Sequence, residues 1–102
     1  MPIFYQSSSG GTTVNTINVE VDFGATEQGN AELVVSAAWV TTTMKLTVSP
    51  SGESTTDHDP EDYVLEGIHG IPCNISNGVG FTLMAGCNYT TFGKYKFNVH
   101  GV

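Results

Sequence analysis

The stretch that decides the fold is Phe81-Thr82-Leu83-Met84-Ala85-Gly86-Cys87-Asn88-Tyr89, in the C-terminal half of the chain. Its odd-numbered positions are apolar or aromatic, and its even-numbered positions are mostly polar or small. Strict alternation of this kind predicts a β-strand with one buried face. Turn-forming residues bound the stretch on both sides, over 76–80 and 90–94. We therefore predict that 81–89 is the middle strand of a three-stranded meander.

The pairing of this strand with the preceding one follows from the requirement that apolar residues share one face. A loop over 76–80 places Cys73 opposite Leu83, which keeps the apolar residues together. A two-residue Asn77-Gly78 turn, normally the stronger hairpin signal, would pair Cys73 with Thr82 and mix the faces. The sequence therefore favours the longer loop.

The pairing with the following strand uses a loop over 90–94, which sets Tyr89 opposite Tyr95 and turns both rings toward the core. In this register Cys73 and Cys87 lie on the same face but four residues apart along the strand, which is roughly 13 Å. A disulfide needs Cα atoms within about 7 Å of each other. We predict two buried free thiols and no intrachain disulfide bond.

Three further segments have alternating patterns and are predicted strands: 17–23, 33–40 and 44–48. Segment 33–40 is apolar on both faces, so we expect it to be central in a sheet or covered on both sides. Asp59-Pro60-Glu61-Asp62 has the composition of a helix start, and a single helical turn is expected there. One or two strands over 63–75 follow, with a bulge or a sheet edge where Gly67, Gly70 and Pro72 interrupt them.

The composition fits one small all-β domain. The chain has 102 residues, of which only 13% are charged, and it contains 12 glycines. That length corresponds to a single domain, and this composition favours strands and turns over helices. We predict an antiparallel β-sandwich over 17–102, jelly-roll-like and with about seven or eight strands, preceded by an extended N-terminal arm over 1–16.

The charge balance excludes several classes of partner. Three Lys and Arg residues stand against ten Asp and Glu residues, which gives a formal net charge of −7. Nucleic acids and anionic membrane surfaces are bound by clustered cations, so neither is an expected partner. No apolar run approaches the roughly 20 residues of a membrane span. The N-terminus also lacks the pattern of a secretory signal, so we expect synthesis and use without translocation.

The predicted arm combines an apolar tip with a flexible tether. Ile3, Phe4 and Tyr5 are consecutive, and the residues over 6–13 are Ser, Gly, Thr and Gln. One interpretation is a frayed terminus. The other is that Ile3, Phe4 and Tyr5 bind a neighbouring subunit, because three consecutive large apolar residues are unusual in a solvated tail. These three are the candidate partner-binding residues.

The sequence has one dense polar cluster, formed by Glu53, Asp57, His58, Asp59, Glu61 and Asp62. Its carboxylates are suitable ligands for Ca²⁺ or Mg²⁺, and Asp57-His58 is a pairing that can orient a general base. The spacing does not fit an EF-hand loop, and a solvated acidic loop with a capped helical turn is the favoured interpretation. No nucleophile elbow or phosphate-binding loop is present. We therefore predict no catalytic, metal or cofactor site and no enzyme activity.

Several short motifs resemble those of a known group of proteins. They are Val21-Asp22-Phe23-Gly24-Ala25, Thr56-Asp57-His58 with Glu61-Asp62, Asn74-Ile75 with Gly78-Val79-Gly80-Phe81-Thr82, and Phe92-Gly93-Lys94-Tyr95-Lys96-Phe97. Together they resemble small structural proteins of tailed-bacteriophage virions, over most of the chain from residue 17 onward. Members often carry Trp near the C-terminus, where this chain has Tyr95 and Phe97. The resemblance implies a β-sandwich that assembles on a virion, and it implies no catalytic residue.

The expected function is that of a virion structural protein, first of all a capsid decoration (cement) subunit. Its expected partners are other virion proteins, such as the major capsid or tail protein, and further copies of itself, a trimer among the candidates. It would be found in the virion after synthesis in the cytoplasm of the bacterial host. The alternative is a tail or fibre module that binds a host surface glycan on a platform of Trp39, Tyr63, Tyr89 and Tyr95. A third interpretation is a cation-dependent module that uses the acidic loop.

Overall fold

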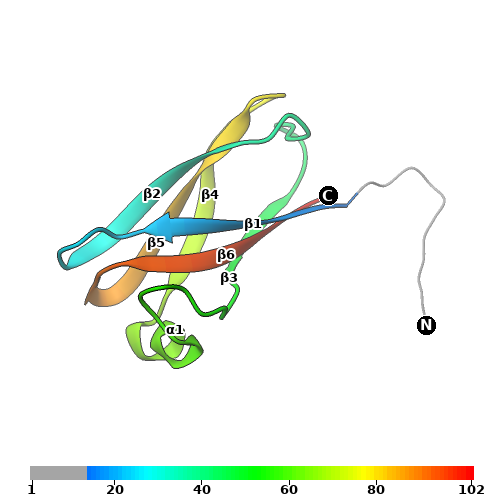
Figure 1. Ribbon diagram of the computed structural model, residues 1–102. Helices are drawn as coiled ribbons and strands as arrows, with labels where there is room; N and C mark the ends of the chain where they lie inside the picture. The colour runs from blue at the N-terminus through cyan, green and yellow to red at the C-terminus, as the bar shows by residue number, and fades with distance from the viewer. Residues whose placement is uncertain (1–13) are drawn as a thin grey trace, which may run out of the picture.

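Two antiparallel three-stranded sheets pack face to face in the computed structural model, which describes residues 14–102 (Figure 1). One sheet has the order β1-β6-β3, with β1 at Asn15–Asp22, β6 at Lys94–Gly101 and β3 at Leu46–Pro50. The other has the order β2-β5-β4, with β2 at Gln28–Ser36, β5 at Gly80–Thr91 and β4 at His69–Ser76. The described residues thus contain six strands rather than about seven or eight. The mostly-β, two-sheet architecture is confirmed.

A short helix, α1 (Pro60–Glu66), lies beside one end of the sandwich (Figure 1). Asp59 is its N-cap and proline occupies the first turn, as the sequence predicts. The helix continues past the single predicted turn, because Tyr63 is buried and Gly67 supplies the left-handed C-cap at φ 65°. The predicted strand start at residue 63 is therefore wrong, and β4 begins at His69. No helix in residues 14–102 is long and apolar enough to span a membrane.

The strand on which the prediction centres is the middle strand of its sheet, but it has one unexpected neighbour. β5 pairs with β4, as expected, and with β2 on its other side. β6 belongs to the opposite sheet, where it pairs with β1 and β3. The backbone of Gly93, between β5 and β6, exchanges hydrogen bonds of 2.8 Å with Phe23 and Gly24 instead. The predicted meander and its pairing of Tyr89 with Tyr95 are wrong.

The β4-β5 hairpin combines the two registers that the sequence suggests. Cys73 pairs with Thr82, the register that mixes faces, whereas Ser76 pairs with Gly80 across a three-residue turn. A β-bulge between Cys73 and Ser76 accommodates the difference, and Asn74 adopts a left-handed φ of 51° there. The predicted pairing of Cys73 with Leu83 is wrong because this extra residue lies on β4.

A second irregularity ends the alternation of β5. Asn30 pairs with Gly86 but Gln28 pairs with Thr91, so extra β5 residues bulge out of the ladder. Tyr89 lies in this segment and is 88% exposed, so the prediction that it faces the core is wrong. Cys87 and Cys73 are only partly buried, and both are free. The predicted absence of a disulfide is confirmed, and the predicted burial of the thiols is wrong.

The position of β2 also differs from expectation. The strand spans Gln28–Ser36 and lies at the edge of its sheet, neither central nor covered on both sides. Its inward residues Leu33 and Val35 contact the core, whereas Val34 is 79% exposed. β4 forms the other edge, in agreement with the expected bulge or edge near Pro72.

The core lies between the two sheets and under the helix. Tyr95, Phe97 and Leu83 are its largest completely buried side chains. Phe81 and Ala85 are buried on the same face as Leu83, so the predicted core face is confirmed over the first half of β5.

Candidate functional site

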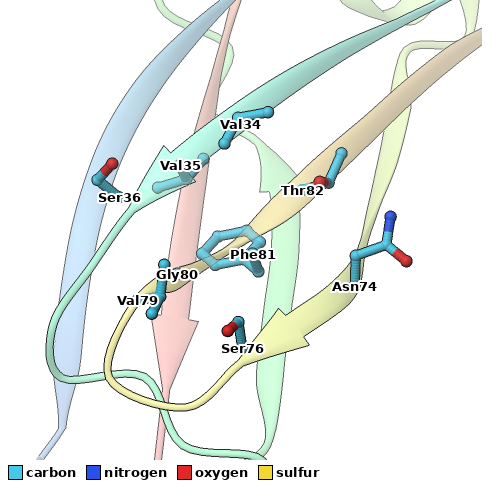
Figure 2. A pocket seen from close by; sticks show the side chains of 9 residues that line it. All are labelled: Val34, Val35, Ser36, Asn74, Ser76, Val79, Gly80, Phe81 and Thr82. Atoms are coloured by element: carbon cyan, nitrogen blue, oxygen red, sulfur yellow. The ribbon is translucent and has the colours of Figure 1, made fainter.

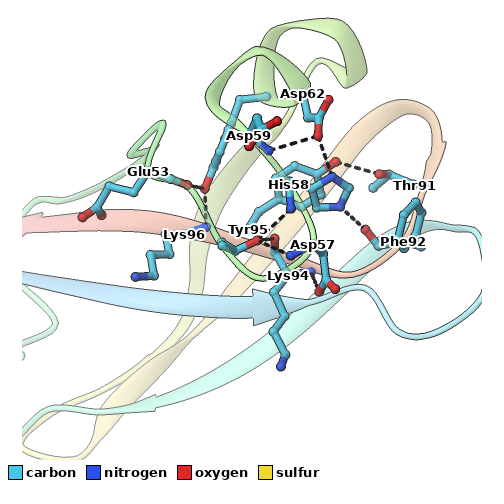
Figure 3. Close-up of polar contacts among 12 residues, drawn as sticks. Glu53, Asp57, His58, Asp59, Asp62, Thr91, Phe92, Lys94, Tyr95 and Lys96 are labelled. Atoms are coloured by element: carbon cyan, nitrogen blue, oxygen red, sulfur yellow. Dashed lines mark hydrogen bonds and ion pairs between the residues drawn. The ribbon is translucent and has the colours of Figure 1, made fainter.

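The acidic segment of the sequence folds around a buried histidine (Figure 3). The imidazole of His58 is 6% exposed and stacks on the ring of Tyr95, with centroids 4.0 Å apart and an interplanar angle of 13°. Its Nδ1 atom lies 3.0 Å from Oδ2 of Asp62, and its Nε2 atom lies 2.5 Å from the carbonyl oxygen of Phe92. Each ring nitrogen therefore faces an oxygen atom at hydrogen-bond distance. His58 therefore ties the helix to the β5-β6 connection.

The segment from 51 to 58 covers an open edge of β6. β3 ends at Pro50, opposite Phe97, so the β6 backbone before Phe97 has no strand on that side. Side chains take the place of the missing strand: the Thr55 hydroxyl donates to the Lys94 carbonyl at 2.7 Å, and the Lys94 N–H donates to Asp57 at 2.9 Å. The segment thereby satisfies backbone groups that would otherwise be unpaired.

Tyr63 and Tyr95 link this segment to the core. The Tyr63 hydroxyl accepts from the Lys96 N–H at 2.8 Å and donates to the Glu53 carbonyl at 2.7 Å. The Tyr95 hydroxyl is 2.8 Å from the hydroxyl of Thr91, which is also buried. Burial raises the pKa of the Tyr95 phenol, which keeps it protonated and able to donate. Both tyrosines are structural anchors in this arrangement.

The candidate chemistry of the acidic cluster does not assemble. The Asp57 carboxylate accepts a hydrogen bond from the Lys94 backbone. The carboxylate beside His58 is that of Asp62. Within residues 14–102, no group of three or more His, Cys, Asp or Glu side chains is arranged to hold a metal ion. His58 is enclosed and both its nitrogens are engaged, so in this conformation it has no atom available to an external substrate. The arrangement supports the structural interpretation of the cluster.

The Asp62 carboxylate gives the cluster a testable acid dependence. Its hydrogen bond from His58 lowers the pKa of Asp62 from its ordinary value of 3.8. A carboxyl group whose pKa is lower in the folded state stabilises the fold above its unfolded pKa, and this stabilisation is lost as the pH falls through the folded value. We expect the stability difference between wild type and Asp62→Asn to be full at pH 5 and to shrink below pH 3.8.

Urea denaturation at a series of pH values measures this difference. Glu61→Gln is the matched control, because Glu61 lies in the same first helical turn and is exposed. A difference that stays constant down to pH 2.5, well below the ordinary value of 3.8, would show that the carboxylate does not act through His58.

The outer face of the β2-β5-β4 sheet exposes several apolar side chains near its centre. Two central cross-strand rows of this face are Ile71-Met84-Glu32 and Cys73-Thr82-Val34, and the rows His69-Gly86-Asn30 and Ser76-Gly80-Ser36 flank them. We call Val34, Ile71, Cys73, Thr82 and Met84 the apolar face. Val34 is 79% exposed and Ile71 is 57% exposed, because no other side chain among the described residues covers them. Because exposed apolar side chains gather on this one sheet face, it is the candidate interaction surface.

The outer face of the opposite sheet is polar throughout. Its cross-strand rows are Thr16-His100-Thr47, Asn18-Asn98-Ser49, Glu20-Lys96 and Asp22-Lys94. The amide of Asn18 bonds Asn98 at 3.0 Å, so part of this face is already internally paired. One sheet of the sandwich therefore presents a surface suited to water, and the other presents a surface suited to contact with another molecule.

Two hollows open on the β2-β5-β4 side. One, of about 180 Å³, lies near the β4-β5 hairpin and is lined by residues that include Val34, Val79 and Phe81 (Figure 2). The other, of about 260 Å³, lies at the opposite end of the strands and is lined by residues that include His69, Ile71 and Met84. A separate exposed pair, Val64 and Leu65, lies on α1. The hollows and the apolar face together form the candidate site.

The proposed glycan platform is not formed by the residues that the sequence suggests. Tyr63 and Tyr95 are buried, and Trp39 is partly buried with its ring beside Gly101. Only Tyr89 of the four is largely exposed. His69 and His100 lie exposed on strands. The candidate partner-binding residues Ile3, Phe4 and Tyr5 lie outside the described residues.

Sequence reasoning missed the apolar face, although the signal for it was present. Val34 and Val40 make segment 33–40 apolar on both sides of its alternation. That pattern has two explanations: a strand covered on both faces, or an edge strand that exposes one of them. The tertiary structure distinguishes these explanations. β2 is an edge strand in the order β2-β5-β4, and within residues 14–102 nothing packs on the Val34 side.

Comparison with known proteins finds no family model, no curated protein and no solved structure that matches this chain.

Proposed function

We propose that this chain is a structural protein of a bacteriophage virion, most specifically a capsid decoration subunit that binds neighbouring virion proteins through its apolar face. The observation that carries the proposal is the contrast between the two outer sheet faces. Val34 and Ile71 are exposed on one of them, whereas the other is lined by Asn, Thr, Lys, Glu and His. Burial of such an apolar surface is the main favourable term in most protein association.

The electrostatics of the domain support the same role. The chain carries a net charge of −7, which keeps free subunits soluble and apart. Glu32, next to Met84, is the one charged residue in the two central rows of this face within the described residues. Contact through this face therefore leaves most of the acidic side chains in water. A subunit of this kind binds a surface of matching shape without needing a cationic partner.

The resemblance of its sequence motifs to those of small tailed-phage structural proteins supports the virion setting. The sandwich that those motifs imply agrees with the two packed sheets. The acidic loop and the buried histidine have structural roles, so the geometry favours a protein that binds over one that catalyses. The glycan-binding alternative keeps only Tyr89 of its four residues on the open surface, and we do not favour it.

A charge placed on the apolar face should abolish association with particles. We expect Ile71→Glu to leave the fold intact, with a change in stability within about 0.5 kcal/mol, since the side chain is 57% exposed. Binding to particles that lack the subunit should nevertheless fall at least tenfold, because a desolvated carboxylate opposes contact. Co-sedimentation with particles of the phage that encodes the chain measures the binding.

Thr47→Glu is the matched control, since Thr47 is exposed on the outer face of β3 in the polar sheet. We expect it to bind like wild type. Cryo-electron microscopy of intact particles should show wild-type chain on the head surface. Absence of the chain from purified particles, or equal binding by Ile71→Glu and Thr47→Glu, would contradict the proposal.

A further inference from the structure

The hollow beside the β4-β5 hairpin is a built feature of the sheet. The bulge at Asn74 interrupts the pairing of β4 with β5 just where the hollow opens. Val34 and Val79 form apolar walls, Phe81 lies beneath, and Asn74 and Ser76 supply polar atoms at the rim (Figure 2). Bulges recur in proteins where a strand is bent to form a site. The hollow is thus a small apolar pocket with polar atoms at its rim.

The size of the hollow suits one aromatic ring. Its volume is about 180 Å³, and an apolar protein cavity of about 150 Å³ is known to bind benzene. An aromatic side chain also brings a large contact area with few rotatable bonds, which makes it an efficient anchor. A peptide with one aromatic ring beside other apolar side chains would place the ring in the hollow and pack its neighbouring side chains against Val34.

The chain itself carries such a peptide. Ile3, Phe4 and Tyr5 are followed by the eight residues of 6–13, which lead to the start of the described domain. Eight extended residues reach about 26–29 Å. The tether therefore allows Ile3, Phe4 and Tyr5 to extend up to this distance from the start of the described domain.

The tether also starts at the same end of the sandwich as the hollow. Asn15 pairs with Gly101, and the ring of Trp39 lies beside Gly101. Trp39 belongs to the loop after β2, where the Val40 carbonyl accepts a 2.8 Å hydrogen bond from Gly78 in the β4-β5 turn. The described domain therefore begins close to the hairpin that borders the hollow.

Charge favours this segment over a second domain as the occupant. All ten acidic residues lie within 14–102, so segment 1–13 contains none of them, and it contains no Lys or Arg. Two domains packed face to face would bring two strongly acidic bodies together. An uncharged segment avoids that repulsion and allows two domains to stay a tether's length apart.

We propose that the hollow lined by Val34, Val79 and Phe81 binds the Ile3–Tyr5 segment of a neighbouring copy, with one aromatic ring seated in it. Each copy then donates its own segment to one neighbour and receives a segment from another. This contact is heterologous, and it links subunits around a ring or along a lattice. The inference rests on the proposed function, because it names the partner that occupies part of the same surface.

Disulfide trapping between two differently substituted chains tests the contact. Full-length Tyr5→Cys and full-length Val34→Cys are made in a Cys73→Ser/Cys87→Ser background and mixed at about 1 mM, because a contact through one seated ring is weak. We expect mild oxidation to give a covalent heterodimer at least fivefold more abundant than with Glu20→Cys in place of Val34→Cys. Glu20 is the control because it is exposed on the polar face.

A chain that carries both Tyr5→Cys and Val34→Cys shows whether the bound segment comes from the same chain or from a neighbouring copy. Covalent dimers and higher oligomers support the neighbouring copy, whereas a crosslinked monomer overturns it. Equal trapping by Val34→Cys and Glu20→Cys also overturns it. If trapping fails while Ile71→Glu still abolishes particle binding, the proposed function stands without this occupant. If trapping succeeds and the chain is absent from particles, the self-contact stands and the proposed function fails.

Discussion

Replacement of Gly80 with alanine is expected to destroy the β2-β5-β4 sheet. Gly80 begins β5 opposite Ser36, with a φ of 151°. A Cβ atom at this position would overlap the backbone carbonyl oxygen of Val35 and lie 3.1 Å from the Ala37 nitrogen. Neither backbone atom can move without separating β2 from β5. We expect a loss of more than about 4 kcal/mol, a large fraction of the 5–15 kcal/mol that stabilises a typical domain.

Gly78→Ala provides the comparison that isolates the overlap. Gly78 also has a positive φ, of 74°, but no atom lies within 4 Å of the position its Cβ would occupy. Alanine there introduces only backbone strain, of about 1 kcal/mol. Far-ultraviolet circular dichroism and urea denaturation of the two variants measure both effects. If Gly80→Ala were as stable as Gly78→Ala, the close approach of β5 to β2 would be wrong.

Removal of the Tyr95 ring is expected to have the second large effect. Tyr95 is completely buried on β6 and contacts three aromatic rings. It stacks on His58, and it meets Phe23 and Tyr63 edge to face, at centroid distances of 5.6 and 5.0 Å. We expect Tyr95→Ala to lower the free energy of unfolding by about 3–5 kcal/mol, since it leaves a cavity where the two sheets, the helix and the acidic segment meet.

Tyr89→Ala is the matched control, because the same side chain is deleted from an 88% exposed position on β5. Its expected effect is within about 0.5 kcal/mol. Tyr95→Phe separates the ring from its hydroxyl: it leaves the buried Thr91 hydroxyl without its partner and should cost about 1–3 kcal/mol. Equal destabilisation by Tyr89→Ala and Tyr95→Ala would show that Tyr89 is buried in the core.

The two tyrosines also show where prediction from the sequence succeeds and where it stops. Alternation correctly identified the core face of Phe81, Leu83 and Ala85, because side chains on a regular strand point to opposite faces in turn. It placed Tyr89 inward by extending the same rule past Gly86. The extra residues of β5 interrupt the alternation there, and no residue type in that segment indicates a bulge.

The helix start within the acidic cluster was predicted correctly, whereas the position of His58 was not. Asp59 and Pro60 are strong local signals, because an N-cap and a proline in the first turn act within a few residues. The role of His58 depends on Phe92 and Tyr95, more than thirty residues later in the chain. Local pattern contains no information about such contacts, so the sequence could not show that the histidine is sealed inside.

The sequence by itself determined that the chain is mostly β, with a core face on 81–85 and a capped helix at Pro60. Each of these follows from backbone preferences or from spacing along one segment. The tertiary structure decided that β6 joins β1 and β3, that β2 is an edge strand, and that Val34 and Ile71 face outward. The physical reason is that alternation states which side of a strand is apolar, whereas the partner of each strand and the exposure of its second face depend on packing among residues far apart in the chain.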